Sequence, residues 1–414
     1  MNATDKIRLA KQASSAVGRA NTLQKNAALK AIADHLVAHS SQIIEANKLD
    51  LAKGEADGIS TGLMDRLRLD EKRIGALAEA VLQVAALADP VGDVKRGMTL
   101  PNGLKLNQVA VPFGVVGAIY EARPNVTIDI AALALKSGNA VVLRGGSSAE
   151  NTNLLLVSIL QNAIASAGLP KDSIQTVDDF GRQGAVEMMQ ARGLIDVLVP
   201  RGSAGLIKAV VEESKVPVLE TGDGVVHIYV DETARADWSV EIVHNSKVQR
   251  PSVCNALETL LVHEKAAERL LPSILKRLSE SGVTIHGDEA TRALFDGAVE
   301  ATEDDWKAEY YSLDLAVRVV SGLDEALEHI AEYSTHHTES IITEDVANAE
   351  RFLQEVDSAV VMVNAATRFT DGGEFGFGAE VGISTQKLHA RGPMGLAELT
   401  STKWLVRGAG QTRV

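Results

Sequence analysis

The chain has 414 residues, of which 45% are hydrophobic and 23% charged, with 34 glycines and few aromatic side chains. This size and composition exclude a disordered chain and predict two or three globular α/β domains. The formal net charge of −14 argues against nucleic acid or anionic lipid as the main partner, because both require a basic surface. No apolar run is long enough to span a membrane, and residues 1–26 lack the apolar stretch of a signal peptide, so we expect a cytoplasmic location.

The N-terminal part of the chain, about 90 residues long, shows the period of amphipathic helices. Ala28, Ile32 and Leu36 follow one another at the spacing that places side chains on one helical face. The period then breaks, and a Pro-Asn-Gly turn at 101–103 lies between two short alternating runs. This pattern predicts a β-hairpin over residues 97–111.

From residue 115 the chain contains short runs of Val, Ile and Leu, each followed by small residues and then by a helical pattern. Such runs suit strands buried on both faces, and the helical spacers suit right-handed crossovers. The sequence therefore predicts a doubly wound parallel sheet. The runs before an expected domain boundary at 235–245 are 114–120, 139–146, 195–203, 215–222 and 225–231. A second cycle of strands and helices is expected after that boundary.

Cys254 is the single cysteine, so an intrachain disulfide and a cysteine-only metal site are both excluded. It lies in the segment QRPSVCNALE, just after Pro251. At a turn near Arg250 or Lys247, backbone amides and positive charge would lower the pKa of the thiol and favour the thiolate. Composition alone leaves a second interpretation open, in which Cys254 is an inert residue of the core.

A glycine-rich segment between a predicted strand and a predicted helix is a candidate phosphate site. Glycines there allow close approach of the backbone, and the start of the helix attracts anions. The residues that we expect to bind the cofactor at this point are Arg144, Gly145, Gly146 and Ser147. No acidic residue follows the strand closely enough to hold a free ribose hydroxyl, which favours NADP over NAD. A purely structural strand-to-helix turn is the alternative.

Gly202 and Ser203 repeat this arrangement after the next predicted strand and form a second candidate cradle, with the same structural alternative. The dinucleotide fingerprint GxGxxG and the kinase P-loop are both absent. Histidines and acids that are neighbours in sequence, such as those at 336–339, do not have the spacing of metal ligands. We interpret that segment as a solvated loop.

Six blocks, in order along essentially the whole chain, resemble the aldehyde dehydrogenase superfamily. They are FGVVGAIYEARPNVT, SGNAVVLRGGS, HIYVDE, KVQRPSVCNALETLLVH, HTESIITED and FTDGGEFGFGAEVGISTQKLHARGPMGLAELTSTKW. The resemblance implies an α/β fold with a doubly wound parallel-sheet NADP-binding domain over residues 1–96 and 112–240. It further implies a second α/β domain, the catalytic one, over 241–385, and a small β oligomerisation flap formed by 97–111 and 386–414.

The resemblance is to the branch of this superfamily that reduces an acyl phosphate. It implies NADPH-dependent reduction of L-glutamyl 5-phosphate to L-glutamate 5-semialdehyde and phosphate, the second step of proline biosynthesis. Cys254 matches the nucleophile that holds the substrate as a thioester, and Asn125 matches the asparagine that stabilises the oxyanion. Glu309 matches the glutamate that holds the nicotinamide ribose. Glu220 matches the glutamate that activates water in oxidising members, and its role here stays open.

The substrate implied by the resemblance carries a phosphate and a carboxylate, so basic residues near these motifs are candidate anion ligands. The candidates are Arg123, Arg250, Arg368, Lys387, His389 and Arg391. We choose Arg123 and Arg250 for substrate binding, because they are nearest in sequence to the expected oxyanion donor and nucleophile.

Three other functions remain to be weighed against this one. An aldehyde dehydrogenase that releases a free acid would use Glu220 as a base. A non-catalytic partner of the glutamate kinase would leave the cysteine without a role, and a cysteine hydrolase would need a histidine beside the thiol and no nicotinamide. The resemblance also implies a homo-oligomer, which the hairpin and the C-terminal segment would build by pairing strands. Glutamate kinase is a candidate partner of the active enzyme as well.

Overall fold

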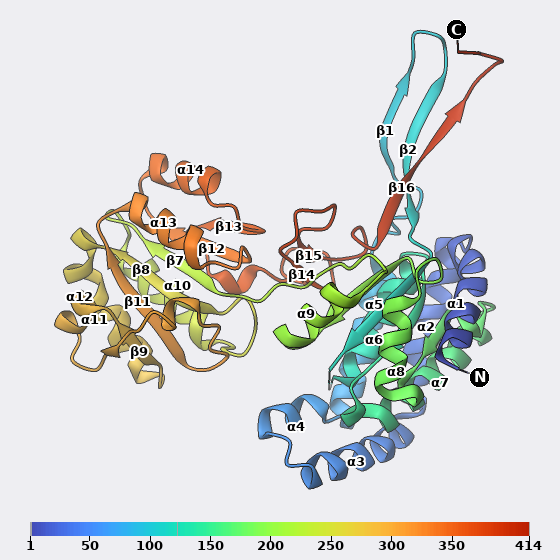
Figure 1. Cartoon of the computed structure of the whole chain (residues 1–414), viewed down its shortest axis with the longest axis horizontal. Coiled ribbons are helices and arrows are strands. Elements are labelled where there is room, and N and C mark those ends of the chain that lie inside the picture. The colour runs from blue at the N-terminus through green and yellow to red at the C-terminus, as the bar shows by residue number, and fades with distance from the viewer. Residues whose placement is uncertain (1, 122, 414) are drawn as a thin grey trace. The chain divides into compact units, whose positions relative to one another are not determined.

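The computed structural model describes residues 2–121 and 123–413, and the chain divides into two compact units (Figure 1). Unit 1 comprises Met1–Thr221, Gly376–Gly382 and Met394–Val414. Unit 2 comprises Gly222–Phe375 and Ile383–Pro393. None of the helices in the described ranges is long and apolar enough to cross a membrane.

Unit 1 begins with five helices, as the period of its N-terminal part predicted. They are α1 (Ala3–Gly18), α2 (Thr22–Ala38), α3 (Ser40–Ala56), α4 (Thr61–Leu67) and α5 (Glu71–Ala86). The predicted apolar face of α2 is confirmed, because Ala28, Ile32 and Leu36 are fully buried. Lys25 on the same helix is buried too, and its ammonium is neutralised by Asp89 at 2.9 Å.

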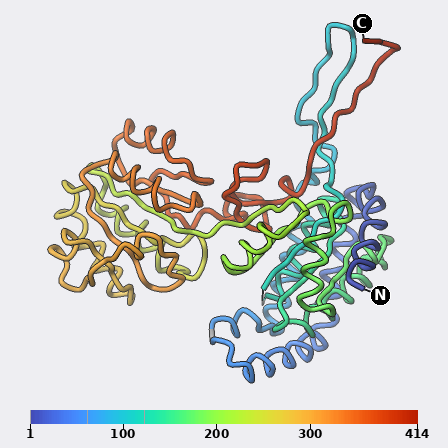
Figure 2. Tube along the Cα trace, in the orientation of Figure 1, coloured from blue at the N-terminus to red at the C-terminus, as the bar shows by residue number. Residues whose placement is uncertain are grey.

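The predicted hairpin forms from β1 (Val94–Thr99) and β2 (Lys105–Pro112), which pair in antiparallel fashion. The C-terminal strand β16 (Thr400–Arg407) pairs with the other edge of β2, also antiparallel. The result is a three-stranded sheet with β1 and β16 as its edges, visible as the cyan and red ribbons in Figures 1 and 2. Most residues of β1 and β16 are exposed.

The core of unit 1 is a parallel sheet in the order β5-β4-β3-β6. Its strands are β3 (Val115–Tyr120), β4 (Ala140–Arg144), β5 (Ile174–Thr176) and β6 (Val197–Arg201). The helices that follow strands in this unit are α6 (Pro124–Lys136), α7 (Glu150–Ser166), α8 (Gly181–Gln190) and α9 (Ala204–Glu213). The chain runs outward from β3 through β4 to β5 and then returns to the other side of β3. The strand order therefore reverses between β3 and β6, which is where doubly wound sheets bind ligands.

Unit 2 contains a seven-stranded parallel sheet in the order β10-β9-β11-β8-β7-β12-β13. The strands are β7 (Val226–Val230), β8 (Leu257–His263), β9 (Thr284–Gly287), β10 (Val299–Glu300), β11 (Asp314–Val320), β12 (Thr338–Ile342) and β13 (Val360–Val363). The helices are α10 (Ala236–Val248), α11 (Glu264–Glu280), α12 (Glu289–Leu294), α13 (Leu323–Tyr333) and α14 (Val346–Glu355). Two further strands, β14 (Gly382–Ser384) and β15 (Gly392–Met394), pair with each other.

Strand β7 corrects one expectation. Its apolar run was expected in the first sheet, before a boundary at 235–245, but β7 pairs with β8 and β12 of unit 2. The first and longest segment of unit 1 accordingly ends at Thr221. The error has a physical reason, because a run of buried β-branched residues suits the interior of either sheet equally well.

The expected solvated loop at 336–339 is wrong for three of its four residues. His337, Thr338 and Glu339 are fully buried, because β12 lies in the interior of the sheet between β7 and β13. The Glu339 carboxylate accepts hydrogen bonds from the His227 backbone N–H at 2.7 Å and from the Ser358 hydroxyl at 3.1 Å. His336 is exposed, as expected.

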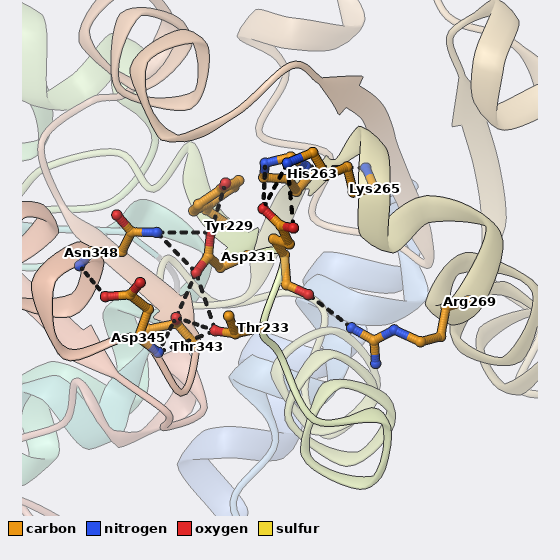
Figure 3. A network of polar contacts seen from close by, with 10 residues as sticks. Tyr229, Asp231, Thr233, His263, Lys265, Arg269, Thr343, Asp345 and Asn348 are labelled. Carbon is orange, nitrogen blue, oxygen red and sulfur yellow. Dashed lines mark hydrogen bonds and ion pairs between the residues drawn. The ribbon is translucent and has the colours of Figure 1, made fainter.

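At the carboxyl ends of β7 and β12, a polar network ties the two strands together (Figure 3). The buried carboxylate of Asp231 accepts hydrogen bonds from the Thr343 hydroxyl at 2.6 Å and from the Asn348 amide at 3.1 Å. The Tyr229 hydroxyl donates to the same carboxylate at 3.1 Å. Because these donors satisfy the hydrogen-bonding capacity of the Asp231 carboxylate, we interpret the network as structural, joining β7 to β12 within unit 2.

Candidate active site

Cys254 lies in the turn-rich segment between α10 and β8 and is half-buried. The segment leads directly into strand β8 and not into a helix. Gly224, just before β7, packs against the backbone of Cys254. A Cβ atom added at Gly224 would lie 1.6 Å from the Cys254 carbonyl oxygen, so only glycine fits there. The close approach fixes the Cys254 backbone near the amino-terminal end of β7.

A short helical turn at Thr367–Phe369 lies against the cysteine segment and carries Arg368. The Thr367 backbone N–H donates to the Ser246 hydroxyl at 3.1 Å, and the Thr367 hydroxyl donates to the Asn255 carbonyl at 2.8 Å. The Asn255 amide in turn donates to the Thr370 carbonyl at 2.8 Å. Asn255, the residue after Cys254, therefore forms hydrogen bonds with Thr367 and Thr370, which lie before and after Arg368 in the chain.

The Arg368 guanidinium is half-buried, and its Nε donates to the Gln249 side-chain oxygen at 2.8 Å. Burial lowers the pKa of Arg368, and repulsion from Arg250 lowers it further. Asp371 and, to a smaller extent, Cys254 act in the opposite direction. Electrostatic interaction thus links Arg368 with both Arg250 and Cys254.

Glu309 also lies near the cysteine segment. Its carboxylate accepts a hydrogen bond from the Tyr311 hydroxyl at 2.6 Å, and the Gly224 backbone N–H lies near it. Burial raises the pKa of Glu309. Tyr311 has a φ of 56°, in the left-handed region that costs free energy for a residue with a side chain, and such strain concentrates at functional sites.

Lys247, one of the two cations considered for the thiol, is paired with a carboxylate. Its ammonium forms a fully buried ion pair with Glu258 at 2.5 Å. Burial lowers the pKa of Lys247 and raises that of Glu258, while their mutual attraction opposes both shifts. The positive charge near Cys254 therefore comes from arginine.

In unit 1 the ends of β3 and β6 meet at the point where the strand order reverses. The Glu121 carboxylate accepts hydrogen bonds from the Ser203 backbone N–H at 3.0 Å and from its hydroxyl at 2.7 Å. A Cβ atom at Gly202 would lie 2.8 Å from the carboxyl carbon of Glu121. The start of α9 thus accepts an anionic group, which in this structure is a side chain of the protein itself.

Asn125 is the second residue of α6, and Arg123 is its N-cap, so Asn125 is not a helix cap. The Asn125 amide donates to the Asp129 carboxylate at 3.1 Å. Burial raises the pKa of Asp129 to about 6, against the opposing effects of Asn125 and Arg201. Arg123 and Asn125, the two predicted residues, therefore both lie at the start of α6.

The first glycine-rich segment also binds carboxylates of the chain. The Gly145 N–H donates to Asp178 at 2.6 Å, and the Arg144 Nε donates to the Gly181 carbonyl at 3.4 Å. Asp50 accepts the backbone N–H groups of Asn151 and Thr152, at the first turn of α7. Sequence reasoning missed these acids because each comes from a distant part of the chain.

The predicted site residues are distributed over the two units. Unit 2 contains Cys254, Arg250 and Glu309. Unit 1 contains Arg123, Asn125, Arg144, Gly145, Gly146, Ser147, Gly202 and Ser203, and also Glu220. Within unit 2, Gly224 connects Cys254 with Glu309, since it packs on the first and its backbone N–H lies near the second.

The model of the aldehyde dehydrogenase family matches residues 1–294, and the chain belongs to this family. It is therefore an oxidoreductase, and the family implies a nicotinamide cofactor. Relatives of nearly the same length carry a more specific name. The gamma-glutamyl phosphate reductase of Leifsonia xyli is 65% identical over 99% of this chain and 97% of its own, and that of Caldanaerobacter subterraneus is 53% identical over 99% of both.

Solved structures agree with these matches. The crystal structure of gamma-glutamyl phosphate reductase from Thermotoga maritima is 46% identical, covers 100% of both chains and superimposes with a TM-score of 0.98. An acetylating aldehyde dehydrogenase from Geobacillus thermoglucosidasius is 18% identical with a TM-score of 0.70, which shows a shared fold. The predicted fold class and the family resemblance are both confirmed.

Proposed function

We propose that this chain reduces L-glutamyl 5-phosphate with NADPH to L-glutamate 5-semialdehyde and phosphate, through a thioester on Cys254. The observation that carries the proposal is the full-length identity of 65% to a gamma-glutamyl phosphate reductase. The reaction is the second step of proline biosynthesis from glutamate. Inside the chain, a single half-buried cysteine beside arginine side chains supports the thioester.

The first half of the reaction needs a nucleophile and a leaving group. The Cys254 sulfur forms a bond to the acyl carbon, and the bond from that carbon to the phosphate oxygen breaks. The bonding electrons leave with phosphate, which takes up a proton from water. The Asn125 amide and the Cys254 backbone N–H are the proposed donors to the transient oxyanion.

A nicotinamide cofactor, when bound, supplies the hydride that converts the thioester carbon into the aldehyde carbon, and the thiolate is then released. The carboxyl ends of β3 and β6 fit the phosphates of such a cofactor, because the Glu121 carboxylate already lies at Gly202 and Ser203. Arg144, Gly145, Gly146 and Ser147 are the proposed second contact. Glu309 is the proposed ligand of the nicotinamide ribose.

The decisive experiment is oxidation of glutamate 5-semialdehyde by the purified protein, followed by reduction of NADP. We expect turnover that requires phosphate or arsenate and that proceeds faster with NADP than with NAD. We expect Cys254→Ser to abolish turnover while the protein stays folded by circular dichroism. Turnover without phosphate, with glutamate as product, would instead support hydrolysis with Glu220 as base and would contradict the proposal.

The assembly of the enzyme belongs to the same proposal. We propose that the β1-β2-β16 sheet pairs with a second copy of the chain, since both of its edge strands are long and exposed. Glutamate kinase, which makes the unstable acyl phosphate, is the proposed partner beyond the homo-oligomer. Arg123 and Arg250 are the proposed ligands of the substrate.

A further inference from the structure

We infer that Arg368 and Arg250 together bind the phosphate group of the acyl phosphate beside Cys254. The inference rests on the proposed function and adds to it the residue that recognises the leaving group. Arg368 is more than one hundred positions from the cysteine in sequence, so no local motif connects the two. The fold of unit 2 connects them.

The first argument is the rigidity with which Arg368 is held. Hydrogen bonds from Thr367 to Ser246 and Asn255, and from Asn255 to Thr370, lie on both sides of Arg368 in the chain. Thr367, Thr370 and Asn255 are buried, so water does not compete strongly for these bonds. A side chain carried by such a pinned turn is pre-organised for binding, because little conformational freedom remains to be lost.

The second argument is the charge around Arg368. Its Nε is bonded to a neutral amide, Gln249, and the guanidinium faces the repulsion of Arg250. Two carboxylates also act on it, but Asp371 accepts the backbone N–H groups of Gly373 and Glu374, and Glu374 is exposed. Two guanidinium groups that repel one another form a favourable site for a group with two negative charges, and the planar fork of arginine matches phosphate oxygens.

The third argument concerns the ion pairs of two other basic candidates in the C-terminal part of the chain. Lys387 and Arg391 both form ion pairs with Asp357, in the case of Arg391 at 2.9 Å. Both side chains therefore already share a carboxylate partner on the surface, and Asp357 balances one of their two positive charges. Arg368 has no comparable ion pair among the described contacts of unit 2.

Binding at this position would assist the reaction as well as the affinity. As the bond between the acyl carbon and the phosphate oxygen breaks, the electron pair moves onto phosphate, and its negative charge increases. Fixed positive charge at that oxygen stabilises the transition state more than the ground state. Loss of Arg368 should therefore lower kcat as well as raise the KM for phosphate in the reverse direction.

The test uses the single cysteine as a reporter. The full-length protein is alkylated with iodoacetamide at increasing concentrations of inorganic phosphate, and the modified fraction is followed by mass spectrometry. Wild type should be protected by phosphate in a saturable manner. In Arg368→Gln, the phosphate concentration for half protection should rise about 10- to 100-fold, as for the loss of a charge-assisted hydrogen-bonding partner.

Protection is a ratio measured within each variant, so a change in the pKa of the thiol does not enter it. Arg368→Lys keeps the charge but loses the fork, and should shift half protection by less than Arg368→Gln does. Arg250→Gln should weaken protection as well. Arg351→Gln is the matched control, since Arg351 lies on the surface of α14 and pairs with Asp324 and Glu355.

Protection of Arg368→Gln at the wild-type phosphate concentration would overturn the inference, and so would a wild-type protein that phosphate does not protect. If Arg368→Gln fails to fold, the lysine variant and the KM for phosphate decide the question. The proposed function fails separately. Full turnover by Cys254→Ser would contradict the thioester mechanism whatever the alkylation shows.

Discussion

Gly224 shows how a residue without a side chain can fix the position of the proposed nucleophile. Its backbone lies so close to the Cys254 carbonyl that any Cβ atom would overlap it, and its N–H lies near the Glu309 carboxylate. The position of the thiol and that of the neighbouring carboxylate therefore depend on one glycine. This dependence leads to a prediction that separates misplacement of the site from general loss of stability.

Replacement of Gly224 by alanine should lower kcat by about 100-fold, because displacement of a catalytic group by about 1 Å has that order of effect. Steady-state kinetics with the semialdehyde would measure it. Gly75→Ala, on the exposed side of α5 with open space around it, is the control and should leave kcat unchanged. Wild-type kcat in Gly224→Ala would show that the segment relaxes without moving the thiol.

Glu121 occupies the start of α9 with its own carboxylate, where we propose that cofactor phosphate binds. Glu121→Gln removes one negative charge from this place and should lower the KM for NADPH by about three- to tenfold, since like charges repel at short range. Glu213→Gln, at the opposite end of α9, should leave that KM unchanged. A higher KM in Glu121→Gln would instead indicate that Glu121 contacts the cofactor directly.

Asp178 is buried beside the first glycine-rich segment, and burial raises its pKa to about 6 from 3.8. A raised pKa in the folded state means that the protein loses stability as the pH rises from about 4 to about 6, by about 3 kcal/mol in total for this group. Asp178→Asn removes that loss and can still accept the Gly145 N–H. Urea unfolding at pH 4.5 and pH 8 should therefore favour the variant more at the higher pH, and a pH-independent difference would contradict the assignment.

Among the elements, those that depend on local pattern were predictable. Helix α2 follows from the spacing of Ala28, Ile32 and Leu36, and the β1–β2 hairpin follows from the Pro-Asn-Gly turn between alternating runs. The burial of Thr338 and Glu339 was not, because both residues are polar and their hydrogen-bonding partners come from other strands and loops. Sequence pattern reports the average environment of a segment and does not identify partners that are distant in the chain.

The site divides in the same way. Cys254 could be singled out because it is the only cysteine in the sequence, and because its neighbours and the family resemblance agree. Arg368 appeared only among several basic candidates. Asp50, Asp178 and Glu121 were missed altogether, since each binds backbone N–H groups of a segment far from it in sequence. Long-range contacts of this kind become visible only when the strands have been placed.

At the scale of the whole molecule, the β1-β2-β16 sheet is a conspicuous surface. Its apolar side chains include Met98, Trp404 and Val406, which are 46%, 44% and 56% exposed. Apolar residues on a thin sheet with two open edges are typical of a surface that is covered in an assembly. The sheet combines β1 and β2, from the first segment of unit 1, with β16, from its last segment.

The double substitution Trp404→Lys with Val406→Lys should therefore convert the proposed homo-oligomer into monomers, which light scattering after size-exclusion chromatography would detect. Val346→Lys, at a position on α14 that is 74% exposed, is the control for added charge and should leave the mass unchanged. A double variant that keeps the mass of the wild-type assembly would show that another surface forms the contact.

The division into units also has a consequence for the time at which each unit is completed during synthesis. Residues 222–375 of unit 2 lie between two parts of unit 1, and β16 follows all of unit 2 in the chain. Because domains fold as they emerge, unit 2 has almost all of its chain before β2 receives its partner strand. A nascent chain that is stalled or truncated before Thr400 therefore leaves the older, N-terminal unit incomplete, with the edge of β2 exposed.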